Sequence, residues 1–463
     1  MNDGPERSLP ESGLPDRSLA ESGLPDQGLA ESGLPDQGLA ESGLPDQGLA
    51  DRSLIESARR ALSSVGGEGV VGLAVSGGGD SMAMLHLMAA VAQRPLAVAT
   101  VDHRLRPEAA AEAAGVGQVC AGLGLPHEVL VWEHGAIAGN LMDAARRARY
   151  GLLADWARAQ GICAVLVAHT ADDQAETVLL GLARAAGLDG LSGMRPEWRQ
   201  GGVWFRRPLL EVTRAALRGY VQQRGLWFVD DPSNQDVTFD RVKMRGALAG
   251  LAGVGITAQG LAQVARNLAA VQADLRGMVA AAAAGLVTER AGSLEIDRAG
   301  FAALPDALAR RLVQAGLLWL SGADYPPRAD ALTRMVQALR DGRGCTLGGC
   351  LLVQGKQAAL LVREPRNLGP EVALGAVWDG RWRVTGPDLG PDLNRVRAVG
   401  IEGLAQLPDW RAAGLARAVA RVTPGVWDGD RLVAAPMLSS GLTSGKGFAA
   451  TLTAGFGLFL LSH

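Results

Sequence analysis

The stretch VVGLAVSGGGDS, residues Val70–Ser81, decides the fold. Its first six residues form a short apolar run rich in valine, which is typical of a strand buried on both faces of a parallel sheet. Three glycines and an aspartate follow, and Met82–Val91 then continues as an apolar helix. Glycines let the backbone approach a ligand closely, and a helix N-terminus presents unpaired amides and a positive dipole end. The stretch therefore predicts a strand, a phosphate-binding loop and a helix.

Asp80 stands out in this loop, because a carboxylate repels phosphate unless a cation lies between them. An Mg²⁺ ion that bridges Asp80 and a polyphosphate would explain its presence. The alternative is an ordinary glycine-rich turn in which Asp80 caps the helix. The loop has the spacing neither of a Walker A loop nor of a dinucleotide-binding fingerprint. The predicted phosphate site consists of Ser76, Gly77, Gly78, Gly79, Asp80 and Ser81.

Strands and helices alternate after this loop, as in a doubly wound parallel sheet. Strands are predicted at 96–101, 127–132 and 162–168, and helices at 54–62, 107–122, 140–160, 172–185 and 213–224. Later segments differ in character: residues 250–340 are mostly helical in pattern, and residues 344–363 predict a β-hairpin. From about residue 366 onward Gly, Pro and Trp punctuate short strands, which favours a small mixed or all-β domain.

A second polar segment follows the last predicted strand of this series. It reads AHTADDQAET from Ala168 to Thr177 and leads into a helix. In an open α/β sheet, ligands bind at the carboxyl ends of the strands, so this segment and the glycine loop should share one edge. We expect His169 to donate to a pyrophosphate oxygen and Asp173 to share Mg²⁺ with Asp80. Helix capping, with Asp172 as the N-cap, is the alternative interpretation.

Two basic segments also fit a site that handles phosphates. The segment ARRARY places Arg146 and Arg149 three residues apart on one helix face, where they could neutralise a leaving pyrophosphate. A solvated basic face fits this segment equally well. Residues 195–245 carry a net charge of +4 with interleaved aromatic residues, a pattern that fits RNA backbone contact and base stacking. Core aromatics with arginines on the surface are the alternative there.

The composition limits the class of protein. The 463 residues are 48% hydrophobic and 20% charged, which is typical of a globular chain of two to four domains. The net charge of -3 divides into -9 for residues 1–56 and +6 for the rest. The four cysteines form no C-x-x-C pair, which argues against a zinc ribbon or a sulfur-relay pair. No long apolar run is present, so we expect no membrane span and a cytoplasmic location.

Residues 11–50 consist of a decapeptide repeat, with ESGLPDQGLA in three identical copies. Each unit has too few apolar residues to offset the chain entropy lost on folding. We therefore expect residues 1–50 to be disordered. A tolerated extension produced by replication slippage and a functional interaction tail are both compatible with the repeat.

Six segments together resemble the tRNA(Ile)-lysidine synthetase family of the PP-loop, or N-type ATP pyrophosphatase, superfamily. They follow the family's order and spacing: SGGGDS, VDHRLRP at Val101, ARRARY at Ala145, AHTADDQAET, RPLLEVTR at Arg207 and DDPSNQD at Asp230. The first marks only the superfamily, whereas AHxxDDxxET and DPSN are more specific. The chain departs from the family pattern at Met142, where many members have Glu, and at Val242, where the family has Asn.

The resemblance implies an adenine nucleotide alpha hydrolase-like α/β fold and an ATP-dependent ligase. Such an enzyme adenylates C2 of cytidine 34 in the CAU anticodon of tRNA(Ile), and the side-chain amine of L-lysine then attacks, giving lysidine, AMP and pyrophosphate. ATP and Mg²⁺ are the expected cofactors, and a homodimer is one assembly to consider. The predicted catalytic residues are Asp80, Arg149, His169 and Asp173, with Asp80 and Asp173 also binding the metal. The predicted tRNA contacts are Arg206, Arg207, Arg241 and Arg245.

The predicted organisation has four parts. They are a disordered repeat tail (1–53), an ATP-binding catalytic domain (54–250), a mostly helical tRNA- or substrate-binding domain (251–365) and a small C-terminal domain (366–463). Two other functions stay open from the sequence. Another PP-loop enzyme, such as a tRNA thiolase or an amidotransferase-type synthetase, is disfavoured because no cysteine has the required context. A non-catalytic ATP- or RNA-binding protein is disfavoured because Asp80, His169 and Asp173 are intact.

Overall fold

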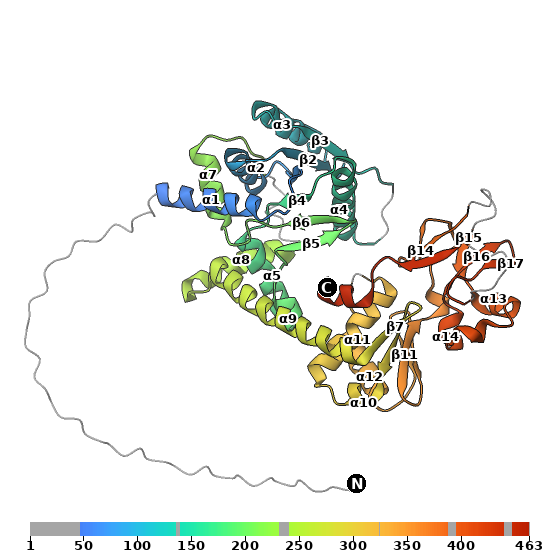
Figure 1. The fold of residues 1–463 in the computed structure, drawn as a ribbon. Helices are drawn as coiled ribbons and strands as arrows, with labels where there is room; N and C mark the ends of the chain where they lie inside the picture. The colour runs from blue at the N-terminus through green and yellow to red at the C-terminus, as the bar shows by residue number, and fades with distance from the viewer. Residues whose placement is uncertain are drawn as a thin grey trace, which may run out of the picture. The chain divides into compact units, whose positions relative to one another are not determined.

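The computed structural model describes residues 47–135, 139–230, 240–323, 325–387, 395–438 and 447–462 (Figure 1). The chain divides into a unit of residues 1–51 and a unit of residues 52–463. The predictions of a disordered tail and of a functional DPSN segment (231–234) concern residues almost wholly outside the described ranges, so they stay predictions. The second unit contains all the sites treated below.

A six-stranded sheet forms the framework of the region that follows the tail. Its strand order is β3-β2-β1-β4-β6-β5, and all neighbours are parallel except β5, which runs antiparallel to β6. Every residue of β1 and β4 is buried, which is why both appear in the sequence as unbroken apolar runs. The predicted doubly wound parallel sheet is confirmed. The strands are β1 (Val71–Ala74), β2 (Leu96–Asp102), β3 (His127–Val131), β4 (Ala164–Val167), β5 (Glu197–Gln200) and β6 (Val203–Arg206).

Helices cover both faces of this sheet. Their bounds are α1 (Gln47–Ser63), α2 (Gly79–Val91), α3 (Ala109–Gly122), α4 (Leu141–Ala159), α5 (Ala171–Ala183), α6 (Leu188–Leu191), α7 (Arg214–Gln223) and α8 (Asp240–Leu251). Buried residues of α1, α2, α3 and α7 share one hydrophobic cluster with the sheet. Residues of α4 such as Leu153 and Trp156 form a second cluster with Val165 and Phe205. All helices and strands predicted between residues 54 and 224 are present, although α1 begins earlier than predicted.

Strands β5 and β6 are missing from the prediction, which places a loop around Arg206. They form a hairpin with Gly201 and Gly202 at its turn, both at positive φ (57° and 83°). A Gly-Gly pair between β-forming residues is a hairpin signal, so the sequence did contain it. Trp198 and Phe205 pair across the hairpin and stack with ring centroids 5.1 Å apart. The alternative of core aromatics therefore holds for part of the predicted RNA-binding flank.

A helical layer and a second sheet follow. The helices are α9 (Ala258–Leu286), α10 (Arg298–Ala302), α11 (Asp306–Ser321) and α12 (Ala329–Arg340). The antiparallel sheet has the order β7-β8-β11-β10-β9 and shares a core with α9, α11 and α12. Its strands are β7 (Val287–Arg290), β8 (Ser293–Asp297), β9 (Cys345–Leu347), β10 (Cys350–Gln354) and β11 (Ala358–Arg363). The predicted hairpin is confirmed as β10 and β11, whereas β7 and β8 interrupt a stretch predicted to be helical.

Short strands dominate the remaining chain, as predicted. One sheet has the order β12-β15-β16-β17 and the other has the order β13-β14-β18. The bounds are β12 (Val372–Ala373), β13 (Val377–Trp378), β14 (Trp382–Thr385), β15 (Arg395–Ala398), β16 (Pro424–Asp428), β17 (Arg431–Ala434), β18 (Ala449–Leu452), α13 (Gly400–Gln406), α14 (Arg417–Ala420) and α15 (Phe456–Ser462). Trp378, Trp382 and Trp427 are fully buried here, so these tryptophans build the cores of the small sheets.

A buried charge cluster joins β11 to the turn between β13 and β14. Arg363 makes two hydrogen bonds to Asp379, at 2.9 and 3.1 Å, and Arg381 donates to the Gly292 carbonyl in the β7–β8 turn at 3.1 Å. All three charged side chains are less than 10% exposed. Burial lowers the pKa of Arg381 to about 10, although the Asp379 carboxylate opposes this change.

In the described part of the chain, no single helix combines the length and hydropathy needed to cross a bilayer. Among the described helices, the pair formed by residues 240–254 and 258–286 has the required length and hydropathy when taken together, but the two segments are bent by 100° relative to each other.

Candidate active site

The glycine loop occupies the carboxyl end of β1 and leads into α2. Gly77 has a φ of +88°, a left-handed conformation that favours glycine. The Val229 amide donates to the Gly77 carbonyl at 2.9 Å and fixes the loop from outside. From inside, the Ser81 hydroxyl donates to the Gly78 carbonyl at 2.9 Å and accepts from the Ser76 amide at 3.2 Å. The first amides of α2 have no intrahelical partner by helix geometry, so the loop presents them to an anion.

The segment after β4 lies at the same edge of the sheet, as predicted. The N-cap of α5 is Thr170, so the alternative with Asp172 as the cap was wrong about the residue. The two oxygens of Asp173 have different partners. Oδ2 accepts from the Thr170 amide at 2.8 Å and from its hydroxyl at 2.9 Å, whereas Oδ1 accepts from Arg214 Nη2 at 2.9 Å. Asp173 is therefore part of a capping box and still directs one oxygen into the site.

The guanidinium of Arg214 forms ion pairs with three acidic residues of the site. Arg214 Nε lies 3.2 Å from Asp80 Oδ2, and Nη1 lies 3.2 Å from Glu176 Oε1, in addition to the contact with Asp173. Asp80 and Asp173 thus meet at Arg214, and the prediction that they share Mg²⁺ stays a prediction. Arg214 also fixes its own position, because its amide donates to Asp172 Oδ2 at 2.7 Å.

The pKa values of Asp80 and Asp173 are shifted in opposite directions. Burial raises the pKa of Asp80 to about 6, although the Arg214 charge opposes this rise. Burial also acts to raise the pKa of Asp173, but Arg214 and the Thr170 amide outweigh it and lower that pKa. Glu176 is 1% exposed, and its Oε1 also accepts from Arg245 Nε at 3.0 Å. Its Oε2 is buried and has no hydrogen-bond partner among the described residues.

His169 is held as a neutral imidazole beside several arginines. Burial, and then the Arg207 charge, lower its pKa to about 3. Arg207 Nε donates to His169 Nδ1 at 3.0 Å, which assigns the ring proton to Nε2. The charges of Arg149 and Arg241 lower the same pKa further. The structure therefore brings three of the predicted basic residues together around the predicted histidine.

The four arginines predicted to contact tRNA have different surroundings. Arg207 is buried: it donates to the Arg195 carbonyl at 2.5 Å and lies 3.8 Å from the Trp198 ring centroid. Arg206 pairs with Glu197 at 3.0 Å, Arg245 binds Glu176, and Arg241 is exposed. Three of the four thus hold groups of the protein itself, and their contacts to RNA stay predictions.

Arg146 and Arg149 share a helix face, as their spacing predicts. Their guanidinium carbons lie 5.2 and 5.9 Å from the Tyr150 ring centroid. The departure at Met142 lies at the start of the same helix, where its side chain is exposed. Val242, the other departure, is half-buried on α8.

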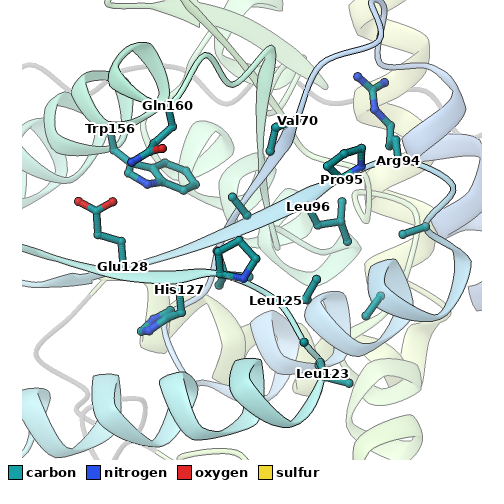
Figure 2. Close-up of a pocket in the computed structure, with 16 residues that line it drawn as sticks. Val70, Arg94, Pro95, Leu96, Leu123, Leu125, His127, Glu128, Trp156 and Gln160 are labelled. Carbon is teal, nitrogen blue, oxygen red and sulfur yellow. The ribbon is translucent and has the colours of Figure 1, made fainter.

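A separate cavity of about 530 Å³ lies at the opposite edge of the sheet (Figure 2). Val70 and Leu96, at the amino ends of β1 and β2, contribute to its wall. Its Arg94 is already engaged, because it donates to the Val65 carbonyl at 2.9 Å and to the Gly69 carbonyl. The phosphate loop and His169 are at the other ends of the strands, so this cavity is not the candidate active site.

Comparison with known proteins shows the family of this chain. The PP-loop domain family matches residues 53–251. A tRNA(Ile)-lysidine synthase from Ruegeria pomeroyi is 46% identical over 400 residues, which cover 85% of this chain and 94% of that protein. A tRNA(Ile)-lysidine synthase from Methylobacterium nodulans is 41% identical over 316 residues, which cover 66% of this chain and 93% of that protein.

Among solved structures, the U34-tRNA thiolase NcsA from Methanococcus maripaludis aligns with 49% of this chain and 79% of that chain. The sequence identity is 13% and the TM-score is 0.43, so this likeness carries no argument about the site. The relatives from Ruegeria pomeroyi and Methylobacterium nodulans align over nearly their whole length and show the family. The chain belongs to the tRNA(Ile)-lysidine synthase family.

Proposed function

We propose that this chain uses ATP to ligate L-lysine to C2 of cytidine 34 in the CAU anticodon of tRNA(Ile). The C2 oxygen of the cytosine attacks the α-phosphorus of ATP, and pyrophosphate leaves. The lysine side-chain amine then attacks C2, the adenylated oxygen leaves with AMP, and lysidine remains. One observation carries the proposal: at a single sheet edge, a glycine loop at a helix N-terminus faces two carboxylates that share a cation. The PP-loop domain supports the use of ATP.

The loop Ser76–Ser81 is the proposed binding site for the ATP phosphates. The first amides of α2 supply hydrogen-bond donors, and the positive end of its dipole favours the negative charge. The hydroxyls of Ser76 and Ser81 lie 3.3 Å apart, and Ser81 already bonds the loop backbone. Ser81 therefore shapes the loop, while the backbone amides supply most of the contact to phosphate.

Asp80 and Asp173 are the proposed Mg²⁺ ligands. Burial without full neutralisation raises the pKa of Asp80 to about 6, which is what a site awaiting a further cation would show. No group of three or more His, Cys, Asp or Glu side chains suited to a metal occurs among the described residues. Two carboxylates are sufficient, because Mg²⁺ typically takes one or two of them and completes its shell with water and phosphate oxygens. A metal bound here would neutralise negative charge on the phosphates.

His169 and the surrounding arginines are proposed to stabilise the leaving pyrophosphate. A neutral imidazole with its proton on Nε2 can donate one hydrogen bond to a phosphate oxygen. Arg149 supplies positive charge near that position, and Arg207 fixes the ring from behind. Donors that are held in place before the reaction lower the barrier without reorganisation at the moment of bond breaking.

The substrates complete the proposal. Arg206, Arg207, Arg241 and Arg245 remain the proposed tRNA contacts, with Arg241 the most exposed of the four. L-lysine, a cytoplasmic location and assembly as a homodimer are parts of the same proposal. The competing function is another PP-loop reaction on tRNA, such as thiolation.

The test is mass spectrometry of tRNA nucleosides after incubation of the full chain with ATP, Mg²⁺, L-lysine and tRNA(Ile). Lysidine should form and should depend on all four components. His169→Ala should abolish it, whereas Arg158→Ala, an exposed position on α4, should not. Unmodified cytidine in the presence of a folded, tRNA-binding chain would contradict the proposal, and a thiolated nucleoside would identify the competing reaction.

A further inference from the structure

A second, cationic cavity lies close to the candidate active site. It has a volume of about 300 Å³ and is bounded by the first half of α4, by strand β5 and by Tyr325 from the connection between α11 and α12. Arg146, Arg147 and Arg199 line it. From the sequence, Arg146 is expected near pyrophosphate and residues 195–245 in an RNA-binding flank, but no ligand has been assigned to the cavity to which both contribute.

The lining of this cavity has an excess of positive charge. Asp143 is the one acidic residue among the lining side chains, and it pairs with Arg147 at 2.8 Å. Among the described residues, neither Arg146 nor Arg199 forms an ion pair, and Arg146 instead lies over the Tyr150 ring at 5.2 Å, so the lining carries a net positive charge. Arg199 is anchored at its stem, because its Nε donates to the Gly202 carbonyl at 3.2 Å. Two arginines that line one cavity from different elements, α4 and β5, favour an anion there.

Aromatic rings form the rest of the wall. Tyr150 and Trp198 meet edge to face with centroids 5.3 Å apart, and Phe205 packs behind both of them. These contacts hold the Trp198 ring rigidly. Tyr325 is 69% exposed, so its ring is available to a ligand at the rim. An anion site with aromatic walls fits a nucleotide, whose phosphate binds arginine while its base or ribose packs against a ring.

The cavity is linked to His169 through two side chains. Trp198 lies at its wall, the Arg207 guanidinium stacks on that ring at 3.8 Å, and Arg207 Nε donates to His169. We propose that this cavity binds a nucleotide of the anticodon loop next to the target cytidine, with its phosphate between Arg146 and Arg199. This inference rests on the proposed function, because it assumes that the reacting base lies beside His169.

The same arrangement gives Arg207 a second role. The Trp198 ring stacks on the Arg207 guanidinium, and Arg207 in turn donates to His169. A ligand in the cavity that moves Trp198 can therefore change the orientation of His169. Arg207 is therefore a positioning residue between the RNA-binding cavity and the phosphate site. Its burial and its bond to the Arg195 carbonyl hold the guanidinium in place for that role, beside the tRNA contact proposed above.

The test measures binding of an anticodon stem-loop by fluorescence anisotropy, with Arg199→Ala and Tyr325→Ala as variants. Both should bind the stem-loop about tenfold more weakly, as expected for loss of one phosphate or one stacking contact. For Arg199→Ala, the slope of log affinity against log salt should also fall by about one. The KM for tRNA should rise while the KM for ATP stays unchanged. Arg158→Ala is the matched control, since it removes an arginine of α4 outside the cavity.

The outcomes separate this inference from the proposed function. Unchanged stem-loop affinity in both variants, with wild-type melting temperatures, would overturn the inference even if the wild-type chain makes lysidine. Arg199→Ala could weaken binding by disturbing the β5–β6 hairpin. Tyr325→Ala tests the cavity without that risk, because Tyr325 lies outside the hairpin. If the variants instead lose affinity for free cytidine monophosphate but not for the stem-loop, the cavity is a mononucleotide site and the RNA assignment is wrong. Weakened stem-loop binding by a chain that makes no lysidine would contradict the proposed function alone.

Discussion

Replacing Asp80 by Asn should stabilise the folded chain near neutral pH while abolishing adenylation. The carboxyl has a pKa of about 6 in the folded chain against 3.8 as the ordinary value, so the folded state binds more protons between these two values. Stability contributed by a raised acid is present at low pH and is lost as the pH rises through 4 to 6. A shift of this size corresponds to about 3 kcal/mol lost by pH 7.5. Asn keeps the shape without the charge and should avoid this loss.

The assay is urea unfolding of wild type and Asp80→Asn at pH 4.5 and at pH 7.5. The difference in free energy of unfolding between the two proteins should move in favour of Asp80→Asn by about 2 kcal/mol from pH 4.5 to pH 7.5, because part of the full effect is already lost at pH 4.5. Relative to wild type, hydrogen exchange of the α2 amides should become slower in Asp80→Asn as the pH rises from 4.5 to 7.5. Asp155→Asn is the matched control, because this carboxylate is 69% exposed on α4 and stays in solvent.

Two results would refute this reasoning. A difference that does not change with pH would mean that Asp80 has no raised pKa in the folded chain. Normal pyrophosphate release by Asp80→Asn would mean that its charge does not contribute to the reaction. The expected combination, a more stable protein without activity, is typical of a functional residue kept at a cost in stability.

Thr170→Val should lower the free energy of unfolding by about 1–2 kcal/mol, as for a lost N-cap, with near-normal pyrophosphate release per folded molecule. Asp173→Asn should lower that release by about 10²-fold, and equal rate losses in the two variants would argue against separate duties for the two Asp173 oxygens. His169→Ala should fold, bind tRNA and fail at pyrophosphate release; a defect confined to lysine transfer would instead place His169 at the amine site. In urea unfolding of wild type, His169 should destabilise the fold as the pH falls from 6.5 toward 3, because its pKa is lowered, and His169→Gln should flatten that acid limb. Deleting residues 1–46 should move the melting temperature by less than about 2 °C, and a larger fall in calorimetry would show that the repeat packs on the body.

The sequence predicted the parallel sheet because its buried strands have an unmistakable signature. β1 and β4 are apolar at every position, and one further apolar residue separates each from the polar segment at its carboxyl end. The rule that ligands bind at this edge was sufficient to bring the glycine loop, His169 and Asp173 together. Arg149 joined them because its helix follows β3, which ends at the same edge.

Arg214 was missed for a physical reason. Its place in the site depends on β6, a four-residue strand that ends in Arg206 and that the apolar pattern does not reveal. Without that strand, the rule about carboxyl ends cannot be applied to the start of α7. The burial of Arg207 could not be predicted either, because the sequence does not tell a buried guanidinium stacked on Trp198 from an exposed one. The cap of α5 was predicted two residues too late, because α5 begins at Ala171 and Thr170 is its N-cap.

The buried cluster of Arg363, Asp379 and Arg381 has a consequence for how the C-terminal half unfolds. Its three charges come from both sides of the predicted boundary at residue 366. Separating the parts would leave Arg363 buried without its counter-ion, at a cost of about 3–5 kcal/mol. The Gly292 turn that accepts from Arg381 is also packed under Trp382, so any side chain there would clash. The last two sheets thus depend on β7–β11 for their charge balance. Although they are separate in sequence, we expect the last two sheets and β7–β11 to unfold together.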